Sequence, residues 1–255
     1  MSVHLEITTK IGCKLACKFC PQKTLVTNYI DKSNTLLSFD NYKTFLETVP
    51  ISVDIHFSGF SEPFLNIETP NMIKYATEKG HTVHLYSTLV GLDEYGVSIL
   101  KEYKPFFTRI HIADQKAMKV ADEKWIQHHD LFLKTGITGS YMAMGEVTET
   151  IAEYLNNKNI RYEIPNMLSR GGNLDLNQNH ISGNLICGMD RWHQNVILPN
   201  GDVYTCCMDY GLTMPIGNLL KEHYSEIWNK AESYKNNINP PKESICRKCE
   251  WAVPI

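Results

Sequence analysis

Cysteine is distributed very unevenly along this chain of 255 residues, and that distribution constrains the fold more than any other feature of the sequence. Three of the eight cysteines lie within residues 13–20, the other five lie between residue 187 and the C-terminus, and residues 21–186 contain none. Cysteines that served only as small buried side chains would be scattered more evenly. We therefore expect two metal-binding centres, one near each end of the chain.

Composition and charge exclude several classes of protein. Residues 1–6 lack the basic start and apolar stretch of an export signal, so we expect a cytoplasmic protein whose thiols stay reduced rather than forming disulfides. No run approaches the ~20 apolar residues that span a bilayer. The net charge of -3 gives no basic excess for a nucleic acid or an anionic membrane surface. We expect neither nucleic acid nor membrane as a partner.

Short strand-like runs alternate with amphipathic helical stretches, which indicates repeated βα units and a parallel sheet. Helical patterns separate the runs, the first opened by Ser38 as an N-cap. The expected helices cover residues 39–49, 71–79, 122–134 and 147–157. The expected strands cover residues 3–9, 53–58, 82–88, 109–113, 140–144 and 160–165.

Several of these strands alternate polar and apolar residues, although strands covered on both faces should be apolar throughout. In three of the strands, polar side chains occupy the alternate positions that face one side of the sheet. These are His4 and Glu6 in the first strand, His56 in the second, and Arg109 and His111 in the fourth. A barrel-like sheet around a polar cavity fits this pattern, and an exposed sheet face is the alternative. Within such a cavity, His56 and His111 are candidate substrate contacts or general bases. The adjacent His128 and His129 lie in a helical pattern, on an expected solvated face.

The alternation of strand and helix patterns ends near residue 180, after Gly171-Gly172 and an Asn-rich stretch. We expect one unit over residues 1–180 and a smaller one over residues 181–255. In the second, Asn200-Gly201 predicts a hairpin between residues 196–198 and 203–204. A helix over about residues 218–234 then leads to the last cysteine pair. The predicted class is α/β, a partial barrel with a small α+β extension.

Cys13, Cys17 and Cys20 place three thiolates on one short loop directly after the first strand. Structural zinc sites and electron-transfer clusters usually take four protein ligands. Three ligands leave one metal position open for a substrate. This loop resembles that of the radical S-adenosylmethionine superfamily, in which CxxxCxxC follows the first strand of a partial (βα)6 barrel and an aromatic residue, here Phe19, precedes the last cysteine.

The resemblance implies a [4Fe–4S] cluster whose open iron binds S-adenosylmethionine. One electron, from a flavodoxin- or ferredoxin-type donor, then cleaves it to a 5′-deoxyadenosyl radical that abstracts hydrogen from a substrate carbon. The resemblance also implies cofactor contacts elsewhere. The segment from Ser58 to Pro63 looks like a variant of the family's GGEP motif, with Gly59, Glu62 and Pro63 in place and Ser61 instead of the second glycine. Ser87 and Thr88 end the third strand, where the family often places groups toward the ribose and carboxylate; ordinary strand propensity explains them equally.

The C-terminal cysteines supply a second and closed ligand set. We expect its ligands to be Cys187, Cys206, Cys246 and Cys249. Four thiolates also suffice for zinc. The pattern nevertheless resembles the SPASM/twitch extensions of radical S-adenosylmethionine enzymes, with a GxxxxC hairpin, an Ile-Trp-Asn helix and a closing CxxC, which implies one auxiliary [4Fe–4S] cluster.

Cys207 is left over from this ligand set. Because successive strand residues point to opposite faces, Cys207 should point away from the metal ligated by Cys206. Three interpretations stay open: a buried small side chain, a replacement ligand, or a thiol that gives hydrogen to a substrate radical, as in some radical epimerases.

The resemblance implies a radical oxidoreductase (dehydrogenase) or epimerase acting on a sugar-like or cyclitol-like small molecule. Peptide modification is the alternative within the superfamily, and a ferredoxin-like electron carrier without catalysis is the alternative outside it. Arg170, after the sixth predicted strand, is a candidate clamp for a substrate phosphate or carboxylate, or a surface arginine beside a linker.

Overall fold

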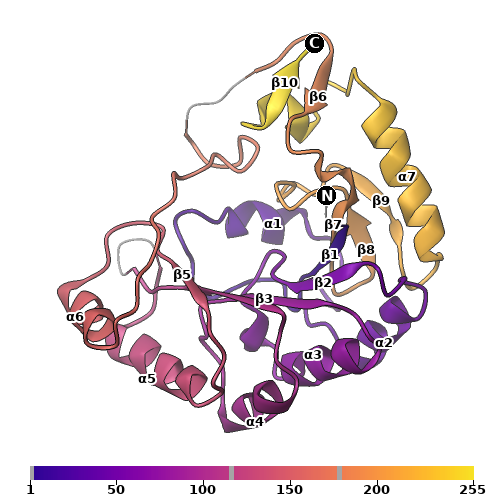
Figure 1. Ribbon diagram of the computed structural model, residues 1–255. Helices are drawn as coiled ribbons and strands as arrows, with labels where there is room; N and C mark the ends of the chain where they lie inside the picture. The colour runs from indigo at the N-terminus through magenta and orange to yellow at the C-terminus, as the bar shows by residue number, and fades with distance from the viewer. Residues whose placement is uncertain (1–2, 115–117, 177–179) are drawn as a thin grey trace.

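The sheet that organises this protein has eight strands in the order β5-β4-β3-β2-β1-β7-β8-β9. The computed structural model (Figure 1) describes residues 3–114, 118–176 and 180–255. Neighbours from β5 to β7 run parallel, and β7, β8 and β9 are antiparallel. The strands are β1 (His4–Ile7), β2 (Asp54–Phe57), β3 (Val83–Ser87), β4 (Phe107–His111), β5 (Ser140–Met142), β7 (Gln194–Ile197), β8 (Asp202–Tyr204) and β9 (Pro215–Asn218), while β6 (Leu185–Cys187) pairs separately with β10 (Ala252–Pro254).

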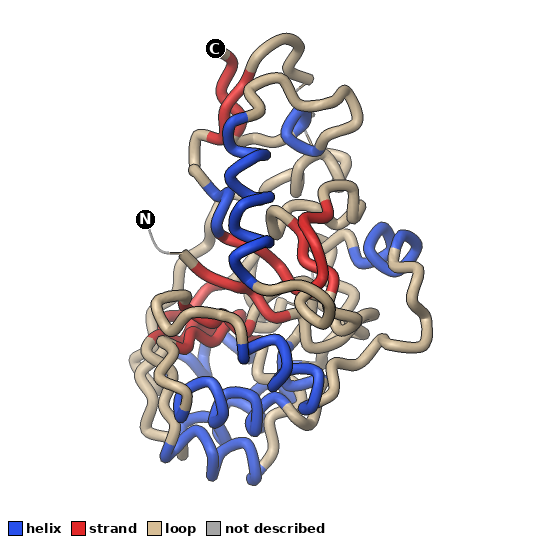
Figure 2. The backbone as a smooth tube through the Cα atoms, turned by 90° about the vertical axis from the view of Figure 1, so that its right-hand side faces the viewer, coloured by secondary structure: helices blue, strands red, loops and turns tan. Residues whose placement is uncertain are grey.

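Most helices gather on one side of the strands, as the turned view in Figure 2 shows. Ser38 is the N-cap of α2, where its side chain accepts a hydrogen bond from Asn41 N at 3.2 Å, as the sequence predicts. The helices are α1 (Gln22–Asn28), α2 (Phe39–Glu47), α3 (Thr69–Glu78), α4 (Glu94–Glu102), α5 (Asp122–Leu133), α6 (Glu149–Asn157) and α7 (Tyr224–Asn236), with short 3-10 turns η1 (Pro63–Leu65), η2 (Arg191–His193) and η3 (Ile245–Lys248).

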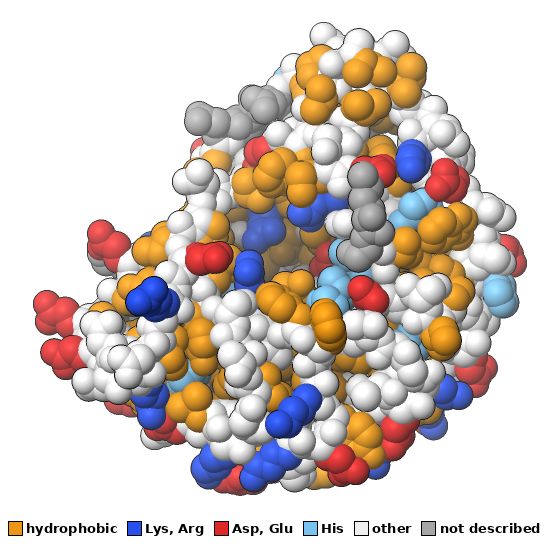
Figure 3. All heavy atoms as spheres, viewed as in Figure 1, with side chains coloured by type: hydrophobic (Ala, Val, Ile, Leu, Met, Phe, Trp, Pro, Cys, Tyr) orange, Lys and Arg blue, Asp and Glu red, His pale blue; other side chains and the backbone are white. Residues whose placement is uncertain are grey.

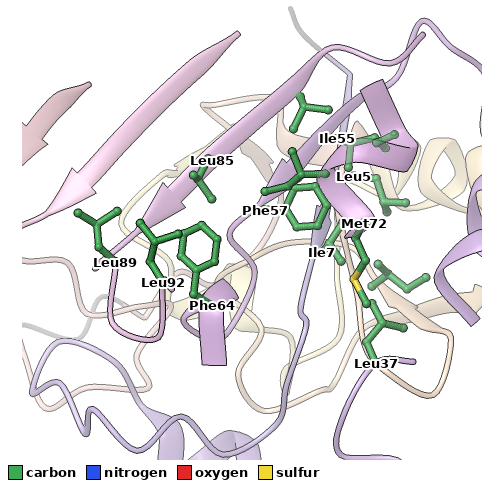
Figure 4. Close-up of a cluster of buried hydrophobic side chains, with 14 of the residues drawn as sticks. Leu5, Ile7, Leu37, Ile55, Phe57, Phe64, Met72, Leu85, Leu89 and Leu92 are labelled. Carbon is green, nitrogen blue, oxygen red and sulfur yellow. The ribbon is translucent and has the colours of Figure 1, made fainter. Parts of the chain in front are cut away.

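The apolar parity of the strands forms the core against the helices (Figure 4). Leu5 and Ile7 of β1, Ile55 and Phe57 of β2, and Leu85 of β3 are all fully buried. The opposite parity carries the polar side chains. The parallel sheet with a polar inner side is thus confirmed, and its carboxyl ends define where a site can form.

The sixth predicted strand is the main departure from expectation. Residues 160–165 form only one bridge, between Met142 and Glu163, supported by the bonds from Ala143 N to Glu163 O (2.9 Å) and from Glu163 N to Tyr141 O (3.0 Å). This segment lies at the sheet edge, Glu163 to Pro165 are exposed, and Pro165 has no N–H to extend the ladder. The partial barrel is therefore open on this side.

The C-terminal region adds β7, β8 and β9 to the main sheet, and its β6 and β10 form a second sheet of two strands. β7 pairs with β1 in parallel, with His4 opposite Gln194 and Ile7 opposite Ile197. The predicted hairpin is confirmed as β7–β8. The last helix begins at Tyr224 rather than at residue 218, because residues 215–218 form β9. Within the described ranges, no helix combines the length and the apolar character that crossing a membrane requires.

His129 corrects the expectation of a solvated histidine pair on α5. Its side chain is fully buried, stacks on Trp125 at 5.0 Å and lies between the hydroxyls of Tyr154 (2.7 Å from Nδ1) and Tyr141 (2.9 Å from Nε2). The Tyr154 hydroxyl donates to Asp130, so the His129 Nδ1–H donates to Tyr154 and Nε2 accepts from Tyr141. A weak amphipathic pattern did not reveal which face of α5 is buried.

Burial, and to a smaller extent Lys158, lower the pKa of His129 to about 4. Because the folded pKa lies below the unfolded value, the unfolded chain binds the proton first, and stability falls as the pH drops from about 6.5 toward 4. We expect His129→Gln to lose stability at pH 7 and to show a shallower decline, by up to about 1.4 kcal/mol per pH unit. Urea unfolding of both proteins across this range measures the difference; equal slopes would contradict the assignment.

Candidate active site and second cysteine cluster

A cavity of about 500 Å³ opens at the carboxyl ends of the parallel strands and collects most of the predicted site residues. Figure 3 shows the molecule hollowed near its centre, with Lys or Arg side chains and hydrophobic side chains around the opening. From the sequence prediction, the lining includes Cys13, Cys17, Phe19, Cys20, His56, Gly59, Ser61, Glu62, Ser87, Thr88, His111, Arg170 and Cys207.

The three N-terminal cysteines lie together on the loop between β1 and α1. Two left-handed residues, Gly12 (φ 82°) and Ala16 (φ 48°), turn the chain back within this loop. Gln22 fastens it: Cys13 N donates to its Oε1 at 3.2 Å, and its Nε2 donates to Cys20 Sγ at 3.3 Å. Cys20 Sγ also lies 3.4 Å from the Tyr210 hydroxyl oxygen, which comes from the C-terminal region.

This donor set fits a soft metal centre that holds three thiolates. Burial raises the pKa of the Cys13 and Cys17 thiols, so binding a metal must displace their protons. The three sulfur atoms face an open cavity, and a fourth position remains for another ligand.

The turn after β2 approaches β1 so closely that only glycine fits at residue 59. Gly59 has φ 53°, and a Cβ there would lie 2.4 Å from Thr8 Oγ1 and 2.9 Å from the Thr8 backbone. Thr8 Oγ1 accepts a hydrogen bond from Phe60 N at 3.1 Å, which fixes the turn. Ser61 Oγ is buried beside the cavity and has no hydrogen-bond partner among the described residues, so this polar atom is available to a ligand.

Glu62 follows in this turn and is held from β3. Its Oε1 accepts from Ser87 Oγ at 2.6 Å and Phe64 N at 3.2 Å, and its Oε2 accepts from Thr88 N and Thr88 Oγ1, both at 2.6 Å. Burial raises the pKa of Glu62, and the bonds from Ser87 and Thr88 oppose that rise. In this structure Ser87 and Thr88 therefore position Glu62. Pro63 begins the 3-10 turn η1 behind the cavity.

The inner side of the sheet holds buried groups able to accept a proton. Burial, with His4 and His84 nearby, lowers the pKa of His56 to about 3, and burial with Arg170 and Arg109 lowers that of His111 to about 4. Both imidazoles are neutral near pH 7. The sequence pattern placed Glu6 on this side but did not single it out as a site residue.

Glu6 is the charged group among them. Burial alone would raise the pKa of Glu6. Three neighbours lower it by more than burial raises it: His4 (Nε2 to Oε1, 3.5 Å), Ser58 (Oγ to Oε2, 2.9 Å) and His56. The net shift of the pKa is therefore downward. The carboxylate therefore stays ionised beside the cavity.

The second cysteine set lines a separate small cavity of about 30 Å³. Cys187 from β6, Cys206 after β8, and Cys246 and Cys249 from η3 and its end all face it. The other walls are mainly apolar, with Trp192, Met208, Met214, Ile245 and Trp251 among them. Burial raises the pKa of Cys246, and that of Cys249 to about 11. Four thiols around one small cavity fit a metal centre with four protein ligands.

Cys206 and Cys207, although adjacent in the chain, face different cavities. Cys206 lines the small cavity, whereas Cys207 lines the large one. Arg191 lines both and donates from Nη1 to Cys207 Sγ at 3.3 Å. Sequence reasoning missed Arg191 and Tyr210, because each is brought to the cavity by the pairing of β7 with β1.

Comparison with known proteins agrees with this arrangement. The SPASM family of iron–sulfur cluster-binding domains matches residues 187–250. No curated protein sequence matches the chain.

Solved structures share the fold over nearly the whole chain. BtrN in complex with AdoMet and 2-DOIA is 18% identical, with 100% of this chain and 94% of BtrN covered and a TM-score of 0.64. Native anSMEcpe with bound AdoMet is 14% identical, with 97% and 86% covered and a TM-score of 0.63. Streptococcus suis SuiB bound to its precursor peptide SuiA is 16% identical, with 98% and 70% covered and a TM-score of 0.65. The predicted resemblance to the radical S-adenosylmethionine fold with a SPASM-type extension is confirmed.

Proposed function

We propose that this protein is a radical S-adenosylmethionine enzyme that oxidises or epimerises a sugar-like or cyclitol-like small molecule. One observation carries the proposal: an open set of three thiols and the Gly59–Glu62 turn line the same cavity at the carboxyl ends of the strands. Solved structures of the same fold contain AdoMet, which supports the assignment of the cofactor.

Different residues of the chain would hold the first cluster, S-adenosylmethionine and the auxiliary cluster. Cys13, Cys17 and Cys20 would ligate a [4Fe–4S] cluster, and the turn around Ser61 and Glu62 would bind S-adenosylmethionine beside it. When bound, this pair supplies a 5′-deoxyadenosyl radical that abstracts hydrogen from an unactivated carbon. The four cysteines of the small cavity would hold the auxiliary cluster.

Oxidation of an alcohol also needs a base for the hydroxyl proton. Glu6, His56 and His111 line the cavity, and each offers a lone pair to which a substrate hydroxyl could donate. The volume of about 500 Å³ suits a small molecule beside the cofactor. Peptide modification is the alternative, because solved structures of this fold include SuiB with its precursor peptide.

Epimerisation is a second candidate, favoured by the place of Cys207. Its thiol lines the large cavity, where it can return a hydrogen atom to a substrate carbon from the side of the C-terminal region. In deuterated water, a true substrate would gain one deuterium without other change if epimerised, and would lose about two mass units if oxidised. Cys207→Ala should abolish only the first outcome.

Anaerobic reconstitution tests the class of enzyme. The wild-type chain should hold about eight irons, and after reduction it should form 5′-deoxyadenosine from S-adenosylmethionine, measured by mass spectrometry. Cys17→Ala should lose about four irons and fall to the level of a protein-free control. Intact clusters with no cleavage, alone or with candidate sugars and cyclitols, would contradict the proposal.

A further inference from the structure

Arginine is concentrated at the cavity far beyond its share of the chain. The sequence contains 5 arginines and 20 lysines. Arg109 from β4, Arg170 after the bridge at residue 163, and Arg191 from η2 all line the large cavity, whereas no described lysine does. Arginine's planar fork suits carboxylate and phosphate oxygens better than a lysine ammonium does. This selection points to an anionic ligand.

Two of these guanidiniums are anchored at Nε, and that of Arg109 also lies over the Phe107 ring, 5.6 Å from its centroid. Arg109 Nε donates to Ser140 Oγ at 3.1 Å, and Arg170 Nε donates to Phe19 O at 3.4 Å. In the described part of the chain, neither forms an ion pair with a carboxylate. The contrast is Arg247 in the C-terminal region, whose Nη1 and Nη2 donate to Ile181, Gly183, Asn239 and Pro240.

The two carboxylates that line the cavity are hydrogen-bonded to other groups. Glu6 is engaged by Ser58 and His4, and Glu62 accepts four hydrogen bonds from Phe64, Ser87 and Thr88. A partly buried cation is stabilised by a nearby anion, so an anionic ligand suits Arg109 and Arg170.

Arg109 and Arg170 line one cavity together with His111, although they are distant in sequence. Both charges also lower the pKa of His111, which is consistent with that placement. Arg170 holds a left-handed backbone (φ 55°), which costs about 1–2 kcal/mol for a residue with a Cβ. Arg191 is directed instead toward Cys207.

We infer that Arg109 and Arg170 form an anion subsite that binds a phosphate or carboxylate group of the substrate, on the wall of the cavity that His111 also lines. This inference rests on the proposed function only in identifying the molecule that carries the anionic group as the substrate. The two guanidinium groups would bind the anionic group of the substrate and so orient the rest of the substrate toward the cysteine loop.

Site-resolved labelling of arginine by phenylglyoxal tests the subsite in the reconstituted protein. Saturating S-adenosylmethionine is present throughout, so its carboxylate is already bound. Inorganic phosphate, acetate and chloride are compared at equal ionic strength, and peptide mass spectrometry follows each arginine. We expect phosphate to slow labelling of Arg109 and Arg170 by at least about fivefold, since protection rises as 1 + [L]/Kd. The exposed Arg161 serves as the internal control and should not change.

Comparison of phosphate, acetate and chloride identifies which anion the site binds. Protection by phosphate alone identifies a phosphate site, and protection by acetate as well identifies a site that also accepts carboxylates. Equal labelling of Arg109 and Arg170 with all three anions would overturn the inference. Labelling needs no turnover, so arginine protection can be observed even if S-adenosylmethionine is not cleaved. Equally, S-adenosylmethionine can be cleaved by a protein that shows no protection. The two proposals can therefore fail separately.

Matched variants complete the test. Arg109→Gln should remove phosphate protection from Arg170, because the pair would no longer bind the anion together. Arg161→Gln should leave that protection unchanged. Iron content and the circular dichroism spectrum show whether each variant is folded. Full protection of Arg170 in a folded Arg109→Gln protein would contradict the shared subsite.

Discussion

Cys206→Ala is expected to lower the iron content of the reconstituted protein from about eight to about four atoms per chain, whereas Cys207→Ala leaves it unchanged. The physical reason is the separation of the two side chains. Cys206 faces the small cavity with Cys187, Cys246 and Cys249, and Cys207 faces the large cavity. The two variants differ by one position and remove the same group, so each is the control for the other.

The same substitution should destabilise the C-terminal region. The four cysteines come from β6, the turn after β8, and η3 with its end, so a shared metal centre would cross-link three segments of the C-terminal region. Binding free energy at such a centre is folding free energy. We expect a loss of about 3 kcal/mol or more, which lowers Tm by about 6–12 °C for a chain of this length. Cys207→Ala should shift Tm by much less.

Iron, zinc and Tm together decide the outcome. If Cys207→Ala loses iron and Cys206→Ala keeps it, the turn after β8 has the other register and Cys207 is the ligand. If the wild-type protein holds about four irons and one zinc, the second centre is a zinc site and the auxiliary cluster is excluded.

The sequence predicts the two cysteine sets because spacing is a local property. CxxxCxxC on one loop and CxxC near the C-terminus need no knowledge of the tertiary fold. Strand parity likewise predicts that His56 and His111 face inward, where the structure brings them to the cavity. Period and spacing are read directly from the chain.

Long-range pairing accounts for what sequence reasoning missed. Nothing local indicates that β7 pairs with β1, which is what brings Arg191 and Tyr210 toward the first cysteine loop. Ser87 and Thr88 have the composition of any strand end, and only their bonds to Glu62, about 25 residues earlier, reveal their role. The failed sixth strand has the opposite cause: its local pattern is adequate, but an exposed edge ending in Pro165 supports only one bridge.

Gly59→Ala is the second large effect we expect. A methyl group at this position would lie 2.4 Å from Thr8 Oγ1 and 2.9 Å from Thr8 N and Cα, and φ is 53°. The backbone of β1 cannot move away, because it is paired with β2 on one side and β7 on the other. Overpacking and backbone strain together should cost about 2–5 kcal/mol. The turn that holds Ser61 and Glu62 would shift, so binding of S-adenosylmethionine should fall as well.

Gly80→Ala separates steric contact from backbone strain. Gly80 also has a positive φ, 92°, but no atom lies within 4 Å of its added Cβ. Its substitution should therefore cost only the strain, about 1–2 kcal/mol, and should leave cofactor binding intact. Denaturant unfolding measures the first difference and equilibrium dialysis of S-adenosylmethionine the second. Equal losses of stability would show that the contact with Thr8 relaxes, and unchanged binding in a folded Gly59→Ala protein would place the cofactor away from this turn.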